Sequence, residues 1–333
     1  MPAAKGKGAA PMAITMGDAS GVGPEIVLRQ YAAGQIVDDV VVYGDAEILE
    51  AGARLLGVDV SISAIRDPGT AAAGRLNVVD LAALSTADFT PGRLNAKAGS
   101  AAREYVRRAT ADALSGTVAG VVTMPMNKEA TQRSTPGFVG HTEFIAELCG
   151  EPDVAMMLTT KDVAVAHVSA HVSLAEAIRR VTPSRVATVI RLTDEAVSRL
   201  RSAPRIAVCG LNPHAGENGL LGREDAEIIA PVIAAERARG LDVSGPYPAD
   251  TVFYQAIRND RFDAIVCMYH DQGHAPMKLV GFESAVNVTI GLPIVRTSVD
   301  HGTAFDIAWQ GTAFTGSLQA ALDLAWTLSA GSP

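Results

Sequence analysis

The chain has 333 residues, of which 48% are hydrophobic and 19% charged, and its formal net charge is −8. This composition is typical of a globular protein with a sizeable core, and the length fits one large domain or two lobes. The acidic balance and the lack of a Lys/Arg run argue against nucleic-acid binding. No apolar run reaches the ~20 residues of a membrane span, which argues against a membrane protein.

Taken from its beginning, the chain opens with Met1–Asp18, which has no long apolar region. This predicts a loose tail and not a signal peptide. The three cysteines, Cys149, Cys209 and Cys267, fit no zinc or redox spacing, and two of them lie in apolar runs. We therefore expect small buried thiols and a cytoplasmic protein.

Short apolar runs alternate along the chain with longer segments at helical spacing. This alternation predicts an α/β architecture with a largely parallel sheet. Strands are expected at Met12–Met16, Val40–Tyr43, Gly120–Met124, Val163–Val168, Arg205–Leu211, Asp263–Met268, Ala285–Ile290 and Ile294–Ser298, and helices at Ser100–Ser115, Leu174–Arg180, Pro183–Arg201 and Arg223–Arg239.

The first strand leads into a glycine-rich turn, Gly17–Glu25. Pro24 suits a first helical turn and Glu25 suits the helix dipole. The dinucleotide fingerprint is absent, because Ile26 stands where the third glycine belongs. A phosphate cradle and an ordinary tight turn explain this segment about equally well.

Three expected strands are followed closely by a histidine: His171, His214 and His270. The last belongs to the run Tyr269–Gln272, after which we expect a turn at Gly273. Ligand sites of open α/β sheets form at the carboxyl ends of strands, and three imidazoles there would make a metal site with open positions. Asp271 and Asn212 are candidate orienting partners. A single histidine is more often a cap or core residue, and we expect His167, inside a strand, to be structural.

Polar residues at two further places suggest an anion site. Gly140–Glu143 precedes an apolar-periodic stretch, so a helix N-terminus near His141 and Thr142 can bind an anion or be an ordinary cap. Asn287 and Arg296 interrupt valine-rich strands, and Lys278 precedes them. Buried polar groups need partners, so either a bound anion or structural ion pairs would explain them.

Taken together, Gly140–Glu143, Asn212–Glu217, Tyr269–Gly273 and Arg296–Ala304 resemble the 4-hydroxythreonine-4-phosphate dehydrogenase family of pyridoxal phosphate biosynthesis. The likeness runs from about Ile14 to the C-terminal helix. It implies a metal held by His171, His214 and His270, the third from the partner across a homodimer interface. It also implies a substrate bound by His141, Thr142, Lys278, Asn287 and Arg296.

A second likeness, to isopropylmalate and isocitrate dehydrogenases, rests on Gly17–Glu25 and His301–Ala308. It implies a two-lobed α/β/α fold with the active site in the cleft between lobes. The boundaries we expect are 1–133 plus 280–333 for the cofactor-side lobe and 134–279 for the metal and dimerisation lobe. It also implies a cofactor loop with Gly302, Thr303 and Asp306, whose carboxylate would repel a 2′-phosphate and so favours NAD over NADP.

These resemblances imply metal-dependent, NAD-linked oxidation of a C3 hydroxyl in a four-carbon 4-phosphorylated hydroxy acid, followed by decarboxylation. Zinc is the default ion, with cobalt, nickel, manganese or magnesium also possible, and Lys278 or Asp271 is the candidate proton carrier. His274–Lys278, Asn218–Gly222 and Ala304–Trp309 resemble a branch acting on 4-phospho-D-threonate or 4-phospho-D-erythronate, which would give dihydroxyacetone phosphate. Two further classes of function stay open: a metal-dependent hydrolase and a non-catalytic phosphometabolite-binding protein.

Overall fold

The computed structural model describes residues 10–36, 39–281 and 284–331, so most of the expected N-terminal tail lies outside the described residues. Within this part of the chain no helix combines the length and apolar character needed to cross a membrane. The chain divides into two compact units, Met1–Pro152 with Leu292–Ser329 (unit 1) and Asp153–Gly291 with Ala330–Pro333 (unit 2). The expected assignment of one lobe to the cofactor and the other to the metal stays a prediction.

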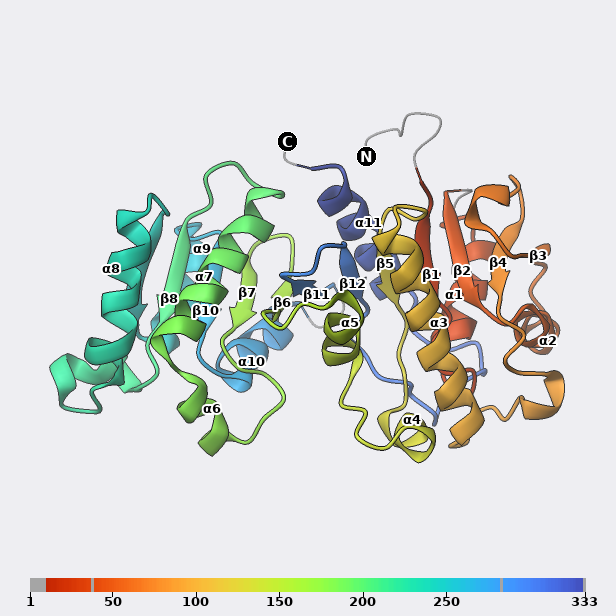
Figure 1. The fold of residues 1–333 in the computed structure, drawn as a ribbon, viewed down its shortest axis with the longest axis horizontal. Coiled ribbons are helices and arrows are strands. Elements are labelled where there is room, and N and C mark those ends of the chain that lie inside the picture. Colours follow the sequence, from red (N-terminus) through yellow and green to blue (C-terminus); the bar gives the residue numbers. More distant parts are fainter. Residues whose placement is uncertain (1–9, 37–38, 282–283, 332–333) are drawn as a thin grey trace. The chain divides into compact units, whose positions relative to one another are not determined.

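Unit 1 is built on six parallel strands in the order β3-β4-β2-β1-β5-β12, counted over the described residues (Figure 1). The central strands β1 and β2 are buried along their whole length, as continuous apolar runs in parallel sheets usually are. The strands span Met12–Thr15 (β1), Val40–Gly44 (β2), Ile62–Ile65 (β3), Leu76–Asp80 (β4), Val121–Thr123 (β5) and Arg296–Ser298 (β12).

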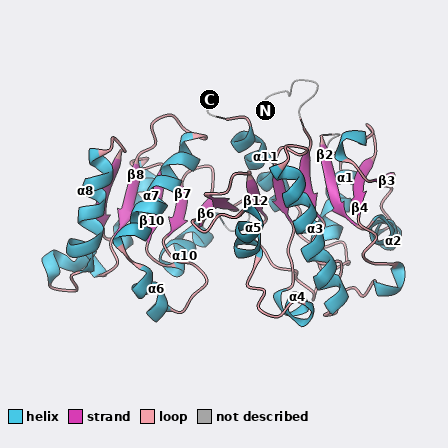
Figure 2. Cartoon of the chain, viewed as in Figure 1, coloured by secondary structure: helices cyan, strands magenta, loops and turns pink. Residues whose placement is uncertain are grey.

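Helices connect these strands, and Figure 2 shows them in cyan beside the magenta strands. The long helix α3 packs on β1, β2 and β5, and α11 packs on β12, β5 and β1. α3 begins at the cap Asn95, whose side chain accepts hydrogen bonds from two backbone N–H groups of its first turn. The helices are α1 (Gly23–Ala32), α2 (Ala46–Leu56), α3 (Ala96–Leu114), α4 (Lys128–Ser134), α5 (His141–Cys149) and α11 (Gly316–Ser329), with short 3-10 turns at Pro68–Thr70 and Thr86–Asp88.

Unit 2 has its own strands, in the order β11-β6-β7-β10-β8-β9 over the described residues. β6 runs antiparallel to both β11 and β7, and the remaining pairs are parallel. The predicted α/β fold with a largely parallel sheet is therefore confirmed. The strands span Ala155–Thr159 (β6), Ala164–His167 (β7), Ile206–Cys209 (β8), Val243–Tyr247 (β9), Ala264–Cys267 (β10) and Val286–Ile290 (β11).

The core of unit 2 follows the two-residue period of its strands. Ile265 and Cys267 of β10 lie in one buried cluster with Val252 and Phe253, whereas Ala264 and Val266 are not in that cluster. Cys209 and Cys267 are both buried free thiols, as expected, whereas Cys149 of unit 1 is only half-buried. The helices are α6 (Leu174–Arg180), α7 (Pro183–Ser198), α8 (Ala230–Ala238), α9 (Ala249–Asn259) and α10 (His270–Gly281), with a 3-10 turn at Pro213–Gly219 and a π-helical turn at Asp225–Ile229.

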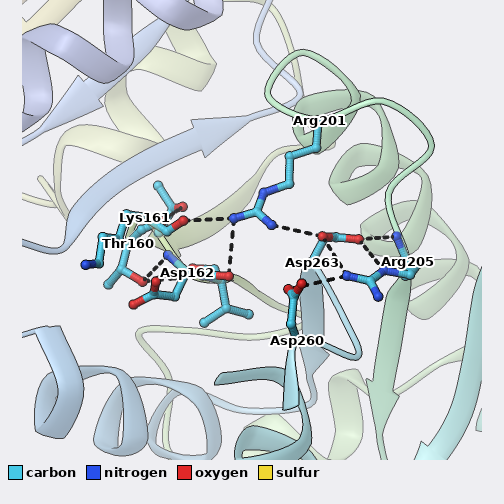
Figure 3. A network of polar contacts seen from close by, with 9 residues as sticks. Thr160, Lys161, Asp162, Arg201, Arg205, Asp260 and Asp263 are labelled. Atoms are coloured by element: carbon cyan, nitrogen blue, oxygen red, sulfur yellow. Dashed lines mark hydrogen bonds and ion pairs between the residues drawn. The ribbon is translucent and has the colours of Figure 1, made fainter. Parts of the chain in front are cut away.

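A network of polar contacts ties together the amino ends of β7, β8 and β10 (Figure 3). Asp263, just before β10, accepts from the Arg205 Nε at 2.9 Å and from the Arg201 Nη1 at 3.0 Å. Arg201 also donates to the Lys161 carbonyl at 2.8 Å, just before β7. Burial alone would raise the pKa of Asp263, but the hydrogen bonds from Arg205 and Arg201 lower it. The network fixes the three strands at the edge opposite their histidine-bearing ends.

One local expectation was wrong. The chain does not turn at Gly273, because α10 begins at His270 and continues through Gly273. The expected helix Arg223–Arg239 is confirmed as a continuous helical segment, in which the π-helical turn Asp225–Ile229 leads directly into α8. The structure also has strands β3, β4, β6 and β9, which were not among the expected elements.

Candidate functional site

The three histidines of the predicted metal site all belong to unit 2 and follow β7, β8 and β10. The rings of His171 and His270 lie with their centroids 5.9 Å apart, and His171 is exposed while His270 is half-buried. His214 lies on a separate turn, Pro213–Gly219. Among residues 10–36, 39–281 and 284–331, no group of three or more His, Cys, Asp or Glu side chains is placed to hold a metal ion.

The turn that carries His214 has an unusual backbone. Residues 214 to 218 all have positive φ, including four that are not glycine: His214, Ala215, Glu217 and Asn218. Such conformations cost of order 1 kcal/mol or more each and concentrate at functional sites. Asp225 supports this turn, because its Oδ1 accepts from the Leu211 N–H at 2.7 Å.

Asn212 also supports that turn, and it does so with its side chain. Its Nδ2 donates to Asp225 Oδ2 and to Glu224 Oε2, both at 2.8 Å. The candidate role of Asn212 as an orienting partner of a metal ligand is therefore not supported by these contacts, since both join it to the following turn. The contacts of Leu211 and Asn212 hold the left-handed segment at its amino end. The His214 ring itself is exposed.

His270 is the first residue of α10, and Asp271 follows it. The Nδ1 of His270 lies 2.7 Å from Asp271 Oδ1, and the Asp271 side chain is 84% exposed. A carboxylate oxygen only accepts, so Nδ1 carries a proton and Nε2 of a neutral ring keeps its lone pair. This carboxylate–histidine arrangement is the usual one for a histidine that binds a metal through Nε2.

His167 and His274 form a buried pair beside His270, although the sequence pattern predicted no more than a structural role for His167. The Nδ1 of His167 lies 3.2 Å from the carbonyl oxygen of Met156, and its Nε2 lies 3.1 Å from the Nδ1 of His274. The rings of His270 and His274 stack with centroids 3.9 Å apart and planes 13° apart. The four-residue spacing of these two histidines was a signal for the stack, but only once their segment is recognised as a helix.

Burial determines the charge of this pair. Burial, opposed by the hydrogen bond to the Met156 carbonyl and assisted by the nearby rings of His270 and His171, lowers the pKa of His167 to about 4. Burial, followed by the neighbouring His167, lowers the pKa of His274 to about 3. Both rings are therefore neutral at physiological pH.

Two predicted substrate residues, Lys278 and Asn287, also lie in unit 2. Lys278 is half-buried and stands eight residues after His270 on α10, with His274 midway between them. Asn287 is on β11, where its Nδ2 reaches the Met156 sulfur at 3.1 Å. Its Oδ1 is buried and has no hydrogen-bond partner among the described residues. A thioether is a weak acceptor, so the Asn287 amide keeps hydrogen-bonding capacity for a ligand.

The predicted anion residues of unit 1 lie close together. Arg296 is the first residue of β12 and only 3% exposed, and its Nη2 donates to Thr123 Oγ1 at 2.6 Å. Burial lowers the pKa of Arg296 to about 10, so the guanidinium stays charged at neutral pH. Burial, then the positive charges of Arg296 and Lys128, lower the pKa of His141 to about 3. His141 is therefore neutral, and its Nε2 is buried without a hydrogen-bond partner among the described residues.

His141 and Thr142 begin helix α5, which has nine residues. Gly140 precedes them in extended backbone, and a Cβ there would lie 3.1 Å from Glu143 Oε2 and 3.9 Å from Lys128 Nζ. The helix N-terminus and two cations thus lie near His141, whose Nε2 is buried, and they favour an anionic ligand. The Glu143 carboxylate also lies near Arg296 and offsets part of this positive charge. The sequence did not reveal Lys128 and Thr123 as neighbours of this site, because only the parallel pairing of β5 with β12 brings Thr123 beside Arg296.

The predicted cofactor segment lies against the glycine-rich turn of unit 1. The Val22 N–H donates to the Thr303 carbonyl at 3.0 Å, and the Trp309 Nε1 donates to the Ala19 carbonyl at 2.9 Å. A Cβ on Gly21 would lie 2.9 Å from the same Thr303 oxygen. These packing contacts are enough to explain the glycine, which favours the tight-turn interpretation of the segment. Gly302 and Asp306 are exposed.

Asp18, in the glycine-rich turn, is a buried acid that the sequence pattern did not single out. Its side chain is 0% exposed, and its Oδ1 accepts from the Ser20 N–H at 2.9 Å. Its Oδ2 has no hydrogen-bond partner among the described residues. Burial raises its pKa to about 6, despite the backbone N–H groups of Ser20 and Asn127.

Comparison with known proteins shows which family has a sequence like that of this chain. The model of the family "Pyridoxal phosphate biosynthetic protein PdxA" matches residues 36–325. A D-threonate 4-phosphate dehydrogenase of Cupriavidus necator is 47% identical over 93% of this chain and 94% of its own length. A 4-hydroxythreonine-4-phosphate dehydrogenase of Beijerinckia indica is 46% identical over 97% of this chain and 96% of its own length.

A solved structure agrees with these relatives. The crystal structure of 4-hydroxythreonine-4-phosphate dehydrogenase from Klebsiella pneumoniae superposes with a TM-score of 0.88 at 43% identity, covering 96% of this chain and all of that one. The relatives and this structure carry names of dehydrogenases, oxidoreductases that act on a CH–OH group. The chain is therefore an oxidoreductase of this type and belongs to the pyridoxal phosphate biosynthetic protein PdxA family.

Proposed function

We propose that the protein is an NAD-dependent dehydrogenase that oxidises the C3 hydroxyl of a four-carbon 4-phosphorylated hydroxy acid, with decarboxylation of the product. The observation that carries the proposal is the buried Arg296 beside the neutral His141, with Lys128 nearby. In a chain with a net charge of −8, two cations near the buried Nε2 of His141 indicate a site for an anionic ligand.

The substituent at C2 separates the candidate substrates, since 4-hydroxythreonine 4-phosphate has an amine where 4-phospho-D-threonate and 4-phospho-D-erythronate have a hydroxyl. The Cupriavidus relative, named for D-threonate 4-phosphate, supports the hydroxyl compounds, as does the likeness of His274–Lys278 to that branch. The Beijerinckia relative supports the amine. All three compounds share the phosphate, the C3 hydroxyl and the carboxylate, so the same residues would bind each of them.

A divalent ion fits the donor chemistry of this site in part. His171 and His270 bring two imidazoles together, and Asp271 leaves the Nε2 of His270 available. The described part of one chain groups no three such side chains. We propose that the set with His214 is completed in a homodimer, to which the partner contributes one histidine. Zinc is the default ion, with cobalt, nickel, manganese and magnesium as alternatives. When bound, such an ion lowers the pKa of a coordinated hydroxyl and stabilises an enolate.

The chain's own residues would bind and orient the substrate. Arg296 supplies a buried charge, and Thr123 fixes the direction of its guanidinium. His141 and Thr142 would bind the anion at the start of α5, and Asn287 and Lys278 of unit 2 are the other proposed substrate residues. The Asp271 carboxylate already accepts from His270, so we assign Asp271 to orienting that ring and prefer Lys278 as the proton carrier.

NAD is the proposed cofactor, with Gly302, Thr303 and Asp306 as its binding residues. The exposed carboxylate of Asp306 can accept hydrogen bonds from a ribose hydroxyl and would repel a 2′-phosphate. The contacts of Thr303 and Trp309 with the glycine-rich turn hold this segment in place in unit 1.

The decisive experiment measures NADH formation with 4-phospho-D-threonate, 4-phospho-D-erythronate and 4-hydroxythreonine 4-phosphate side by side, with added divalent ion. We expect turnover with at least one of them and dihydroxyacetone phosphate from the first two. Phosphate-ester cleavage without NADH would indicate a metal-dependent hydrolase. Tight binding without any turnover would indicate a non-catalytic phosphometabolite-binding protein.

A further inference from the structure

The buried pair His167–His274 has no role in the proposed function so far. His167 lies at the end of β7, and His274 lies on α10 one helical turn after His270. Both side chains are buried, at 1% and 8% exposure, within unit 2. Two buried imidazoles are costly unless they are hydrogen-bonded, so their partners define what they do.

The Met156 carbonyl oxygen, which lies beside His167, fixes the direction of the hydrogen bonds in this pair. The Met156 carbonyl oxygen only accepts, so the His167 Nδ1, 3.2 Å away, carries the proton. The neutral His167 ring therefore accepts through Nε2, and the His274 Nδ1 at 3.1 Å donates to it. With the Met156 carbonyl as the acceptor from His167, both rings carry the proton on Nδ1, and the lone pair of His274 lies on its Nε2.

Gly273 allows this pair to form. A Cβ at Gly273 would lie 2.6 Å from the Nε2 of His167 and 2.7 Å from the Val165 Cγ1. Both distances are shorter than side-chain contacts permit, so any larger residue would push the His167 ring away. A glycine inside a helix costs about 1 kcal/mol relative to alanine, and the close approach of His167 gives a reason for it here.

The ring of His274 then defines the plane of the His270 ring. The two imidazoles stack with centroids 3.9 Å apart and planes 13° apart, while the Nδ1 of His270 is occupied by Asp271. Asp271 fixes the tautomer of His270 but, being 84% exposed, cannot fix the ring's tilt by packing. The buried, hydrogen-bonded His274 is the contact that can.

We propose that His274 is a positioning residue for the metal-ligating His270, holding its ring by stacking, and that the hydrogen bond to His167, itself bonded to the Met156 carbonyl, holds the His274 ring in place. This inference rests on the proposed function, because it assumes that His270 binds a divalent ion. It adds two histidines to the site that act through another residue and do not touch the ion.

The first test separates stacking from hydrogen bonding in the full-length chain. Co2+ is titrated into the metal-free protein without NAD and followed by absorbance and calorimetry. We expect His274→Ala and His274→Gln to weaken Co2+ binding by about tenfold or more, the usual effect of losing a partner of a metal ligand. His274→Phe keeps a ring for stacking, and we expect it to restore most of the affinity.

Matched variants exclude general loosening of α10. Met277→Ala removes a buried side chain from the same helix, and we expect it to lower the melting temperature but leave Co2+ affinity unchanged. Gly273→Ala keeps every imidazole but displaces His167, and we expect it to weaken Co2+ binding. If His274→Ala bound Co2+ as the wild type does, or if Met277→Ala weakened binding equally, the inference would be overturned.

A second readout does not depend on the metal. Nitrogen-15 NMR of the histidine side chains in the metal-free protein should show both His167 and His274 with the proton on Nδ1. An Nε2–H tautomer for His274 would overturn the inference and leave the metal proposal standing. A wild-type protein that binds no divalent ion would overturn the metal proposal itself, and this inference with it.

Discussion

The Nη2 of Arg296 donates to the Oγ1 of Thr123 at 2.6 Å, although the two residues are 173 positions apart in the chain. The parallel pairing of β12 with β5 makes this contact possible, with Arg296 opposite Val121 and Ser298 opposite Thr123. The guanidinium is thereby held in a fixed orientation inside the protein while keeping its charge. A buried, oriented cation is what recognition of a phosphate or carboxylate requires.

Replacing Arg296 tests the anion site directly. A lost charge-assisted hydrogen bond to a buried anion costs roughly 1.5–3 kcal/mol, so Arg296→Ala should lower kcat/KM by at least about tenfold. NAD affinity should change little. Arg296→Lys should retain only part of the wild-type kcat/KM, because a point charge cannot reproduce the planar guanidinium. Unchanged kcat/KM with a lower melting temperature would instead make Arg296 a structural residue.

Removing metal or one ligand tests the proposed metal site. His214 is exposed on its left-handed turn, so His214→Ala should abolish turnover while leaving the melting temperature of the metal-free protein nearly unchanged. Chelator treatment should remove activity, and a divalent ion should restore it. Full activity of a verified metal-free preparation would contradict the metal assignment.

The cofactor preference depends on one exposed carboxylate. Asp306→Lys should weaken NAD binding and narrow the preference for NAD over NADP, because it removes a repulsive charge from the position of the 2′-phosphate. Steady-state kinetics with both cofactors measure this change. A wild type that prefers NADP would show that Asp306 does not bind the ribose.

A site shared between subunits predicts complementation. His270→Ala and His214→Ala chains should each be inactive, but a mixed dimer should have one site with both lesions and one with neither. Mixing the two proteins should therefore restore part of the activity. The control is a tagged exchange assay, and proven exchange without recovered activity would argue against sharing.

Asp18 predicts a pH dependence of stability. Its folded pKa is raised from 3.8 to about 6, so the folded protein binds more protons than the unfolded chain between these values. This group's contribution to stability is therefore lost as the pH rises through that window. Because one pKa unit corresponds to about 1.4 kcal/mol, Asp18→Asn should stabilise the protein above pH 6 by about 1 to 3 kcal/mol.

Denaturant unfolding of the wild type and Asp18→Asn at pH 4 and pH 7.5 measures this effect. Asn keeps the acceptor for the Ser20 N–H, so the two proteins should be close in stability at the lower pH. If the wild type and Asp18→Asn had the same free energy of unfolding at pH 4 and also at pH 7.5, burial would not perturb the pKa of the Asp18 carboxyl.

The sequence by itself determined the fold class and most of the candidate residues. The alternation of apolar runs with amphipathic segments was enough for the α/β sheet, since strands buried on both faces appear as continuous hydrophobic runs. The sequence also showed that His171, His214 and His270 each follow a strand. Because the carboxyl ends of parallel strands share one edge of a sheet, these three histidines were expected at the same edge. Long motifs identified the family that the comparisons confirmed.

The tertiary structure alone decided which of these residues meet. Gly273 suggested a turn, but α10 continues through it. The close approach of His167 from β7, a contact between residues distant in the sequence, explains the glycine instead. For the same reason His167, which was predicted to be structural, proved to form a hydrogen-bonded pair with His274 beside His270. Local patterns carry propensity and periodicity, whereas burial, tautomers and pKa values depend on neighbours that only the folded chain provides.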